Sequence, residues 1–315
     1  MSLSIGVVGL PNAGKSTLFN ALVKGYQAPV ADYPFTTIKP NVGVVQIPDV
    51  RLDKIAEVLK LPKKLPATVE LVDIAGLVKN AHKGEGLGNQ FLGEIRNVAA
   101  ILHIVRGFAN DKIAHVEGKI DPQNDLEIVK TELELADIDK TDSERSEGAA
   151  KADYLLSKKP VFYVCNVDEK DLKDFSPQKY NLPADTLPVC AKLEAELLNL
   201  SESDQKEYLE SLGVKQSALI RVILEAYKIL NLVTFYTLLP EQVQAWPIAK
   251  GTLAPQAAGK IHADMEKGFI AAEVITFEKL IAAGSWQTAK EKGWIETKGR
   301  DWQMKDGDVV YFKFS

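Results

Sequence analysis

The sequence has few cysteines and no long hydrophobic run. Its 315 residues include only two cysteines, Cys165 and Cys190, which excludes a disulfide framework and is typical of a reducing compartment. The longest apolar runs, such as residues 5–10 and 161–165, are far shorter than the roughly 20 residues that cross a bilayer. The first residues do not read as a secretory signal either. We therefore expect a cytoplasmic protein without a membrane partner.

Positive charge is not in excess. The net charge is −5, from 38 Lys and Arg against 43 Asp and Glu, so the chain is not expected to coat nucleic acid through bulk charge. Residues 232–315 hold ten basic and ten acidic side chains, so the negative excess lies before them. A hydrophobic content of 46% and a charged content of 26% are typical of a globular chain, and the length predicts two domains with room for a small module.

Short apolar runs alternate with helical stretches over about the first 200 residues. Strands are expected at 3–10, 42–47, 68–72, 99–105, 160–165 and 186–190, and helices at 16–24, 51–59, 88–97, 126–137 and 193–198. The apolar runs lack alternation with polar residues, which is typical of parallel strands buried on both faces. The order of elements predicts an α/β fold with a doubly wound, mostly parallel sheet.

Two further regions differ from this pattern. Residues 136–159 turn polar, and residues 126–159 are expected to form a short helical insert, so the α/β domain would comprise residues 1–125 and 160–230. From residue 232 onward, β-branched and alternating runs separated by glycine and proline turns predict a small α+β domain over 232–315. All four tryptophans fall there, and we expect the core of that domain to form around them.

The strongest motif lies at Gly9–Ser16, which reads GLPNAGKS and matches the complete phosphate-binding pattern G-x-x-x-x-G-K-S. It stands between an apolar strand and a helix, as the motif requires. Backbone N–H groups of such a loop cradle a polyphosphate. Lys15 would add a positive charge at the β and γ phosphates, and Ser16 a hydroxyl for Mg²⁺.

Two later segments fit a phosphate-sensing switch. Asp73 follows the strand 68–72 and precedes Gly76 by three residues, so its carboxylate can hold the Mg²⁺ shell while the Gly76 N–H meets a γ-phosphate. Upstream, Thr36 and Thr37 offer a hydroxyl that could complete the metal shell.

This ordered set resembles the translation-factor class of GTPases. The segments YPFTT at 33–37, DIAGLV at 73–78 and KGEGLGN at 83–89 are similar to the Obg-related branch, and within it to the YchF family of Obg-like ATPases. The resemblance implies that Thr37 binds the metal, with Thr36 as second choice. It covers nearly the whole chain except the insert, where the family carries a long helical hairpin.

The resemblance also extends to the last 84 residues, which look like a TGS domain, a ubiquitin-like β-grasp. WPI at 246–248, the turn at 259–265 and DGDVVYF at 306–312 carry this similarity. It implies contact with the ribosome or ribosomal RNA through that domain. A cluster of possible phosphate contacts comprises Lys250, Lys260, His262 and Lys267.

The base-reading segment departs from the guanine pattern Asn-Lys-x-Asp. Here Asn166 is followed by Val167 in place of lysine, and Glu169 replaces the aspartate. The same departure characterises the YchF family, so the resemblance implies that ATP is preferred to GTP and that the backbone at Val167 lines the base pocket. Residues 190–192 resemble a further base-contacting loop.

The sequence leaves several candidates for the group that positions the attacking water. Leu77 stands where many GTPases carry a glutamine, so the role falls to His82, to His103, to a backbone group or to a partner. Asn12 resembles the asparagine of potassium-activated members, which implies K⁺ as a possible activator, although a loop-shaping asparagine would look the same. Residues 79–89 are expected to act as a switch.

The sequence thus predicts a ribosome-associated, Mg²⁺-dependent ATP-hydrolysing switch, expected to be a monomer. The alternatives are an Obg-type GTPase of ribosome assembly and a nucleotide-gated adaptor with negligible hydrolysis. Lys15 and His103 are the expected catalytic residues, and Ser16 and Thr37 the metal ligands. The residues expected to hold the nucleotide are Asn12, Ala13, Gly14, Lys15, Ser16, Thr17, Asp73, Gly76, Asn166, Val167, Glu169 and Ala191.

Overall fold

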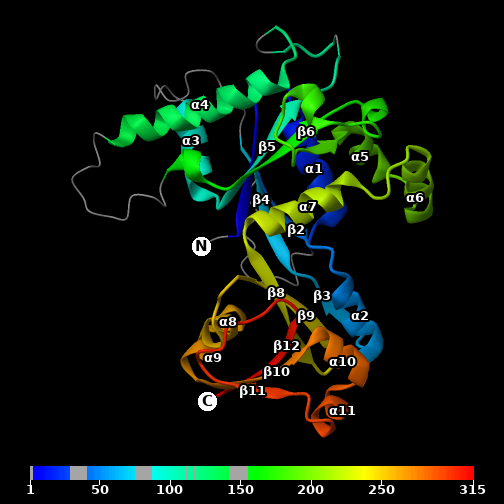
Figure 1. Ribbon diagram of the computed structural model, residues 1–315, viewed down its shortest axis with the longest axis vertical. Coiled ribbons are helices and arrows are strands. Elements are labelled where there is room, and N and C mark those ends of the chain that lie inside the picture. Colours follow the sequence, from blue (N-terminus) through cyan, green and yellow to red (C-terminus); the bar gives the residue numbers. More distant parts are fainter. Residues whose placement is uncertain (1–2, 29–40, 75–86, 111, 116–117, 142–154) are drawn as a thin grey trace. The chain divides into compact units, whose positions relative to one another are not determined.

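The computed structural model describes the chain except residues 1–2, 29–40, 75–86, 111, 116–117 and 142–154 (Figure 1). The chain forms two compact units. The first unit takes the chain up to Val45 together with Val69–Leu230. The second unit combines Gln46–Thr68 with Asn231–Ser315.

The first unit is built on a six-stranded sheet in the order β2-β4-β1-β5-β6-β7. Its pairs β1–β4, β1–β5, β5–β6 and β6–β7 are parallel. The strands are β1 (Ser4–Val8), β2 (Val42–Gln46), β4 (Thr68–Asp73), β5 (Ala100–Arg106), β6 (Val161–Asn166) and β7 (Leu187–Val189). The two central strands, β1 and β5, are buried throughout, as the apolar runs predict, whereas alternate residues of β2 and β4 are half-buried. The predicted α/β class is confirmed.

Helices cover both faces of this sheet (Figure 1). Helices α3 and α4 lie on one side, and α1, α5 and α7 on the other. The helices of this unit are α1 (Lys15–Tyr26), α3 (Leu87–Asn97), α4 (Pro122–Thr141), α5 (Ala191–Leu197), α6 (Glu202–Ser211) and α7 (Ala218–Ile229). Parallel strands require such crossover helices, which is why the sheet is covered on both faces.

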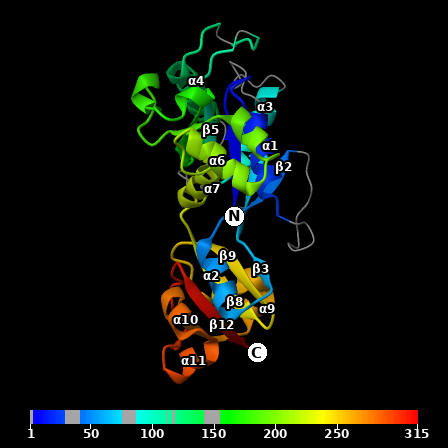
Figure 2. The same cartoon turned by 90° about the vertical axis from the view of Figure 1, so that its right-hand side faces the viewer.

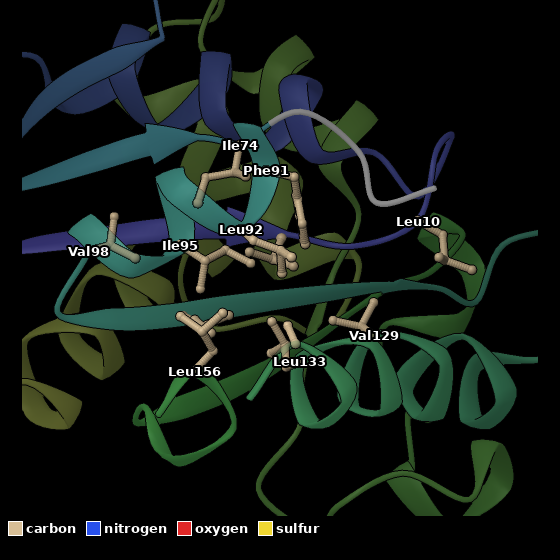
Figure 3. Packing of buried hydrophobic residues seen from close by; sticks show 12 residues of the cluster. Leu10, Ile74, Phe91, Leu92, Ile95, Val98, Val129, Leu133 and Leu156 are labelled. Atoms are coloured by element: carbon tan, nitrogen blue, oxygen red, sulfur yellow. The ribbon is translucent and has the colours of Figure 1, made fainter. Parts of the chain in front are cut away.

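Helix α4 is part of the core of the first unit rather than of a surface insert. Val129 and Leu133 are at most 5% exposed and lie against Phe91 and Ile95 of α3 (Figure 3), in the same core cluster as Ile101 of β5. The spacing of these α4 residues places them on one helix face, which explains the burial. The predicted insert over 126–159 is therefore wrong for its described first part. Residues 142–154 lie outside the described residues.

The second unit contains a mixed six-stranded sheet in the order β11-β10-β12-β8-β9-β3. Its strands are β3 (Lys63–Leu65), β8 (Leu232–Leu239), β9 (Gln242–Ala249), β10 (Phe269–Thr276), β11 (Glu296–Lys298) and β12 (Asp308–Phe314). β8 pairs antiparallel with β9 and parallel with β12. The first strand after residue 230 therefore lies beside the last strand of the chain in the middle of the sheet.

Residues 46–68 belong to the second unit, although the sequence-based boundary assigns them to the α/β domain. β3 pairs parallel with β9 at the edge of the second sheet, and helix α2 (Val50–Leu59) buries Leu52 and Ile55 there. Asp49 caps α2 and accepts a hydrogen bond of 2.5 Å from the Tyr236 hydroxyl. The guanidinium of Arg51 lies 2.6 Å from an Asp306 carboxylate oxygen. The second unit is thus discontinuous in sequence.

The remaining helices of this unit lie on both sides of its sheet. They are α8 (Ala254–Ile261), α9 (Ala263–Lys267), α10 (Phe277–Ala283) and α11 (Trp286–Glu291). Figure 2 shows α2 and α10 on one side of the sheet and α9 on the other. The main core cluster contains Phe235, Phe269 and Phe312, with Trp246 and Trp302 only partly buried at its border. The expectation of a core formed around the tryptophans is wrong, because the smaller phenylalanines fill the interior.

Candidate nucleotide site

The phosphate-binding loop lies between β1 and α1, as the sequence predicts. Gly14 caps α1 in the left-handed region, with φ 101°. A Cβ at this position would overlap the side-chain nitrogen of Asn166. Glycine is therefore required at Gly14 both by its backbone conformation and by the close approach of Asn166.

Lys15 is buried at the start of α1, with 8% of its surface exposed, and its Nζ donates to the carbonyl oxygen of Leu10 at 3.0 Å. Burial lowers the pKa of Lys15, and the carboxylate of Asp73 acts in the opposite direction. Asp73 ends β4 and pairs in register with Val7 of β1. Lys15 and Asp73 thus lie together at the carboxyl edge of the parallel sheet, where open α/β sheets bind ligands.

Ser16 and Thr17 are exposed in the first turn of α1, and Ala13 is buried before it. The Ser16 hydroxyl makes no hydrogen bond to any residue that the structure describes. Thr36, Thr37, Gly76, Leu77 and His82 lie outside the described residues.

Asn166 joins the phosphate-binding loop to the base-reading loops. Its Nδ2 donates to the carbonyl oxygen of Ala13, and its Oδ1 accepts from the N–H of Ala191, each at 3.0 Å. The side chain is 6% exposed. The expected residues Ala13, Asn166 and Ala191 are thereby brought together at one point.

The two residues that depart from the guanine pattern are both held by protein contacts. Val167 is 1% exposed and its N–H donates to the carbonyl oxygen of Val189 at 2.8 Å. Glu169 accepts a hydrogen bond of 2.9 Å from the hydroxyl of Tyr208 on α6. An aspartate that reads guanine must instead accept from two donors of the base, so Glu169 in this contact does not reproduce that arrangement.

Asn12 takes the left-handed conformation, with φ 66°, and its Nδ2 donates to the carbonyl oxygen of Ala114 at 3.1 Å. Both features agree with the interpretation that Asn12 shapes the loop. Because the amide nitrogen is engaged, the amide oxygen of Asn12 is directed away from Ala114 and could serve as an oxygen ligand.

His103 lies in the middle of β5, next to Val8 of β1 and Tyr163 of β6. It is 3% exposed, and its Nε2 has no partner among the described residues. Burial, with a smaller effect of the Lys15 charge, lowers the pKa of His103 to about 4. His103 is therefore neutral at pH 7 and has the burial of a core histidine.

A second buried histidine was not singled out by the sequence. His115 Nε2 lies 3.0 Å from a carboxylate oxygen of Asp125, and both side chains are nearly inaccessible. It follows Ala114, the residue whose carbonyl oxygen accepts from Asn12. The signal in the sequence is weak, because the pairing partner is ten residues away in a loop and a helix start rather than in a compact motif.

Together, the glycine-bearing loop before α1, the buried lysine and the parallel sheet define a P-loop nucleotide-binding protein of the GTPase fold. A model described as a 50S ribosome-binding GTPase matches residues 4–166, and a model of the C-terminal domain of YchF GTPases, described as a protein of unknown function, matches residues 232–315. The chain belongs to the YchF family of ribosome-binding ATPases.

The similarity to curated relatives extends over the whole chain. The chain is 44% identical to the ribosome-binding ATPase YchF of Escherichia coli O157:H7 and 39% identical to that of Bacillus subtilis, with all of both proteins covered in each comparison. It is 39% identical to Obg-like ATPase 1 of Gallus gallus, covering 93% of that protein. The alignment to the Escherichia coli protein spans 364 positions, more than the 315 residues of this chain, so that relative has segments without a counterpart here.

Solved structures agree with this assignment. The structure of the Schizosaccharomyces pombe YchF GTPase matches 99% of this chain and 98% of its own, with a TM-score of 0.82 and 34% identity. A GTP binding protein from Pyrococcus horikoshii matches with a TM-score of 0.61 at 18% identity, which concerns the fold alone. Within the described part of the chain, no helix is both long and apolar enough to cross a membrane.

Proposed function

We propose that this chain is a Mg²⁺-dependent nucleoside triphosphatase that hydrolyses ATP to ADP and phosphate and works at the ribosome. The observation that carries the proposal is the pair of hydrogen bonds by which Asn166 connects the phosphate-binding loop, at Ala13, to the loop at Ala191. The segment that begins at Asn166 lacks the guanine pattern. Relatives that align over the full chain are named ribosome-binding ATPases. The protein is further proposed to be cytoplasmic. It is also proposed to be a monomer, and size-exclusion chromatography with light scattering can test its oligomeric state.

The residues present fit a magnesium ion. The Ser16 hydroxyl and the Asp73 carboxylate are hard oxygen donors, the kind of ligand that Mg²⁺ prefers. Asp73 lies close enough to Lys15 to act on its pKa. Among the described residues no group of three or more acidic, histidine or cysteine side chains is set for a metal. This agrees with a Mg²⁺ held by one or two protein ligands and by the nucleotide. We propose Ser16 and Thr37 as protein ligands, with Asp73 near the shell.

When bound, Mg²⁺ neutralises the charge that develops between the β and γ phosphates. Lys15 would add its own charge there, and backbone N–H groups from Asn12 to Thr17, with that of Gly76, would orient the phosphates. With these roles, the protein would accelerate hydrolysis by positioning the phosphates and by electrostatic stabilisation, and not through a covalent intermediate.

The preference for ATP is supported by Val167 and Glu169. A buried valine cannot donate as the lysine of the guanine pattern does, and the Glu169 carboxylate accepts from Tyr208. Without a paired acceptor for the guanine edge, the site loses its means of favouring GTP over ATP. We propose that Asn166, Val167, Glu169 and Ala191 line the base pocket.

We propose that His103 positions the attacking water. A histidine with a lowered pKa is neutral at pH 7 and can accept a proton or orient a water, and the buried Nε2 of His103 has no partner among the residues that the structure describes. Potassium activation is proposed through the amide oxygen of Asn12. Initial rates in K⁺ against Na⁺, for the wild type and for His103→Gln, test both points.

Contact with ribosomal RNA is proposed for the second unit. Lys250, Lys260, His262 and Lys267 are all exposed on it. His262 is partly committed to its own chain, because its Nδ1 accepts from the N–H of Asp264 at 3.2 Å. Phosphate contacts of this kind weaken steeply with salt. Co-sedimentation of Lys250→Glu and Lys267→Glu with ribosomes over a salt series tests the assignment.

The deciding experiment measures phosphate release by the purified full chain from MgATP and from MgGTP, with and without ribosomes. The proposal expects turnover of ATP in preference to GTP and stimulation by ribosomes. Preference for GTP would favour the Obg-type GTPase. Binding of ATP with no release under any condition would favour the nucleotide-gated adaptor.

A further inference from the structure

Arg106 is a buried cation at the ligand edge of the first sheet. It is the last residue of β5 and pairs in register with Asn166, the residue that braces the phosphate-binding loop. Arg106 is 1% exposed, and no carboxylate of the described chain forms an ion pair with it. Burying a charge in this way is costly unless its donors are satisfied, so the arginine must be held by other polar groups.

Those groups are three backbone carbonyl oxygens that follow β5, those of Phe108, Asn110 and Ala114. Nε of Arg106 donates to Phe108, Nη1 to Ala114 and Nη2 to Asn110, each at 3.2 Å. The guanidinium carbon also lies 4.6 Å from the centre of the Phe108 ring. Arg106 thus acts as the interior support of this loop, a role that depends on the rigid fork of donors that lysine lacks.

The same loop is fastened to the phosphate-binding loop. The carbonyl oxygen of Ala114 accepts from Arg106 Nη1 and also from Asn12 Nδ2, at 3.1 Å. Asn12 itself is in the left-handed conformation inside the phosphate-binding loop. The position of one carbonyl oxygen therefore links the buried arginine to the side chain of Asn12.

We infer that Arg106 is a positioning residue for the nucleotide phosphates and acts through the Ala114 carbonyl and Asn12. It holds the Ala114 oxygen where Asn12 can bond to it, and this bond fixes the turn of the loop whose N–H groups meet the phosphates. The positive charge of Arg106, which forms no ion pair with a carboxylate among the described residues, also favours an anionic ligand at this edge. The inference rests on the proposed binding of nucleotide at this loop.

A double-mutant cycle on the full chain tests the linkage. Arg106→Lys keeps the charge but loses the fork, and Asn12→Gly removes the amide while tolerating the left-handed backbone. Calorimetry with MgADP should show each single variant binding about tenfold more weakly than the wild type. The double variant should bind within about twofold of the weaker single variant, because both substitutions break the same link. For Arg106→Lys, which leaves the Asn12 amide in place, steady-state rates should show the loss in KM rather than in kcat.

Fully multiplied losses in the double variant would overturn the inference, because Arg106 and Asn12 would then act independently. Leu133→Ala is the matched control for a loss of stability in the same unit; it should lower the unfolding temperature and leave MgADP affinity unchanged. If Arg106→Lys fails to fold, Arg106→Gln takes its place in the cycle. Absence of MgADP binding by the wild type would instead contradict the proposed function itself, and the inference with it.

Discussion

The side-chain nitrogen of Asn166 donates a hydrogen bond of 3.0 Å to the carbonyl oxygen of Ala13. The amide oxygen of the same side chain accepts from the N–H of Ala191 at the same distance. A single buried amide therefore holds the loop expected to bind phosphates and the loop expected to contact the base in one arrangement.

This arrangement predicts the effect of Asn166→Asp. A carboxylate can still accept from Ala191 but cannot donate to Ala13, whose oxygen then faces a buried negative group. We expect a loss of stability of about 1–3 kcal/mol and weaker binding of MgADP. Thermal unfolding and calorimetry measure the two effects. Asn199→Ala, on the exposed surface, is the control; equal effects of both substitutions would contradict the brace.

Base selectivity should respond to restoring the guanine pattern. In the double variant Val167→Lys with Glu169→Asp, the segment reads Asn-Lys-Asp-Asp, and the shorter acid no longer reaches Tyr208 as Glu169 does. We expect the ratio of GTP to ATP affinity to rise by about tenfold or more, since paired hydrogen bonds to a base edge discriminate strongly. Competition with a fluorescent nucleotide gives the ratio.

Glu196→Asp supplies the control for that experiment, because Glu196 is an exposed acid of α5. It should leave the ratio unchanged. An unchanged ratio in the double variant would show that base selectivity arises elsewhere.

The buried His103 predicts a dependence of stability on pH. Its pKa in the folded chain is lowered to about 4 from the usual 6.5, so between these values the unfolded chain binds more protons than the folded one. Stability is therefore complete above about pH 6.5 and is lost as the pH falls toward 4, by about 3 kcal/mol in total. Urea unfolding of the wild type and of His103→Gln across this range measures the contribution. Parallel pH profiles of the two proteins would be inconsistent with a neutral buried histidine.

Residues 46–68 should be needed for the second unit. Ile55 of α2 is fully buried, so Ile55→Ala removes apolar contacts and should destabilise that unit by about 2–5 kcal/mol. MgADP binding by the first unit should persist, whereas co-sedimentation with ribosomes should weaken. Leu133→Ala, buried in the first unit, is the matched control. Loss of nucleotide binding in Ile55→Ala with ribosome binding retained would refute this division of the chain.

The elements that the sequence predicted well are those whose signals are local. The strand before Gly9, the loop and the helix from Lys15 carry a motif and a hydrophobic pattern that agree with one another. β1 and β5 were recognisable from their apolar runs, which lack alternation with polar residues, and every residue in them is indeed buried. The same local signals identified Asn166 as a site residue, although not the two hydrogen bonds that it makes.

The parts that could not be predicted depend on contacts distant in sequence. β3 has three residues and is recognisable only by its pairing with β9, some 180 positions later. Helix α4 was assigned to an insert because the family carries a helical hairpin at that place and the sequence turns polar from residue 136, whereas the apolar face of α4 packs on β5. Arg106 carries no motif at all, since its partners are backbone carbonyls.

The most direct test of the account is calorimetric titration of the full chain, in magnesium and potassium, with ATP and with GTP. The account predicts that both the wild type and a surface control such as Glu196→Asp bind ATP more tightly than GTP, and that Lys15→Ala binds neither. Tighter binding of GTP, or undiminished ATP binding by Lys15→Ala, would contradict it.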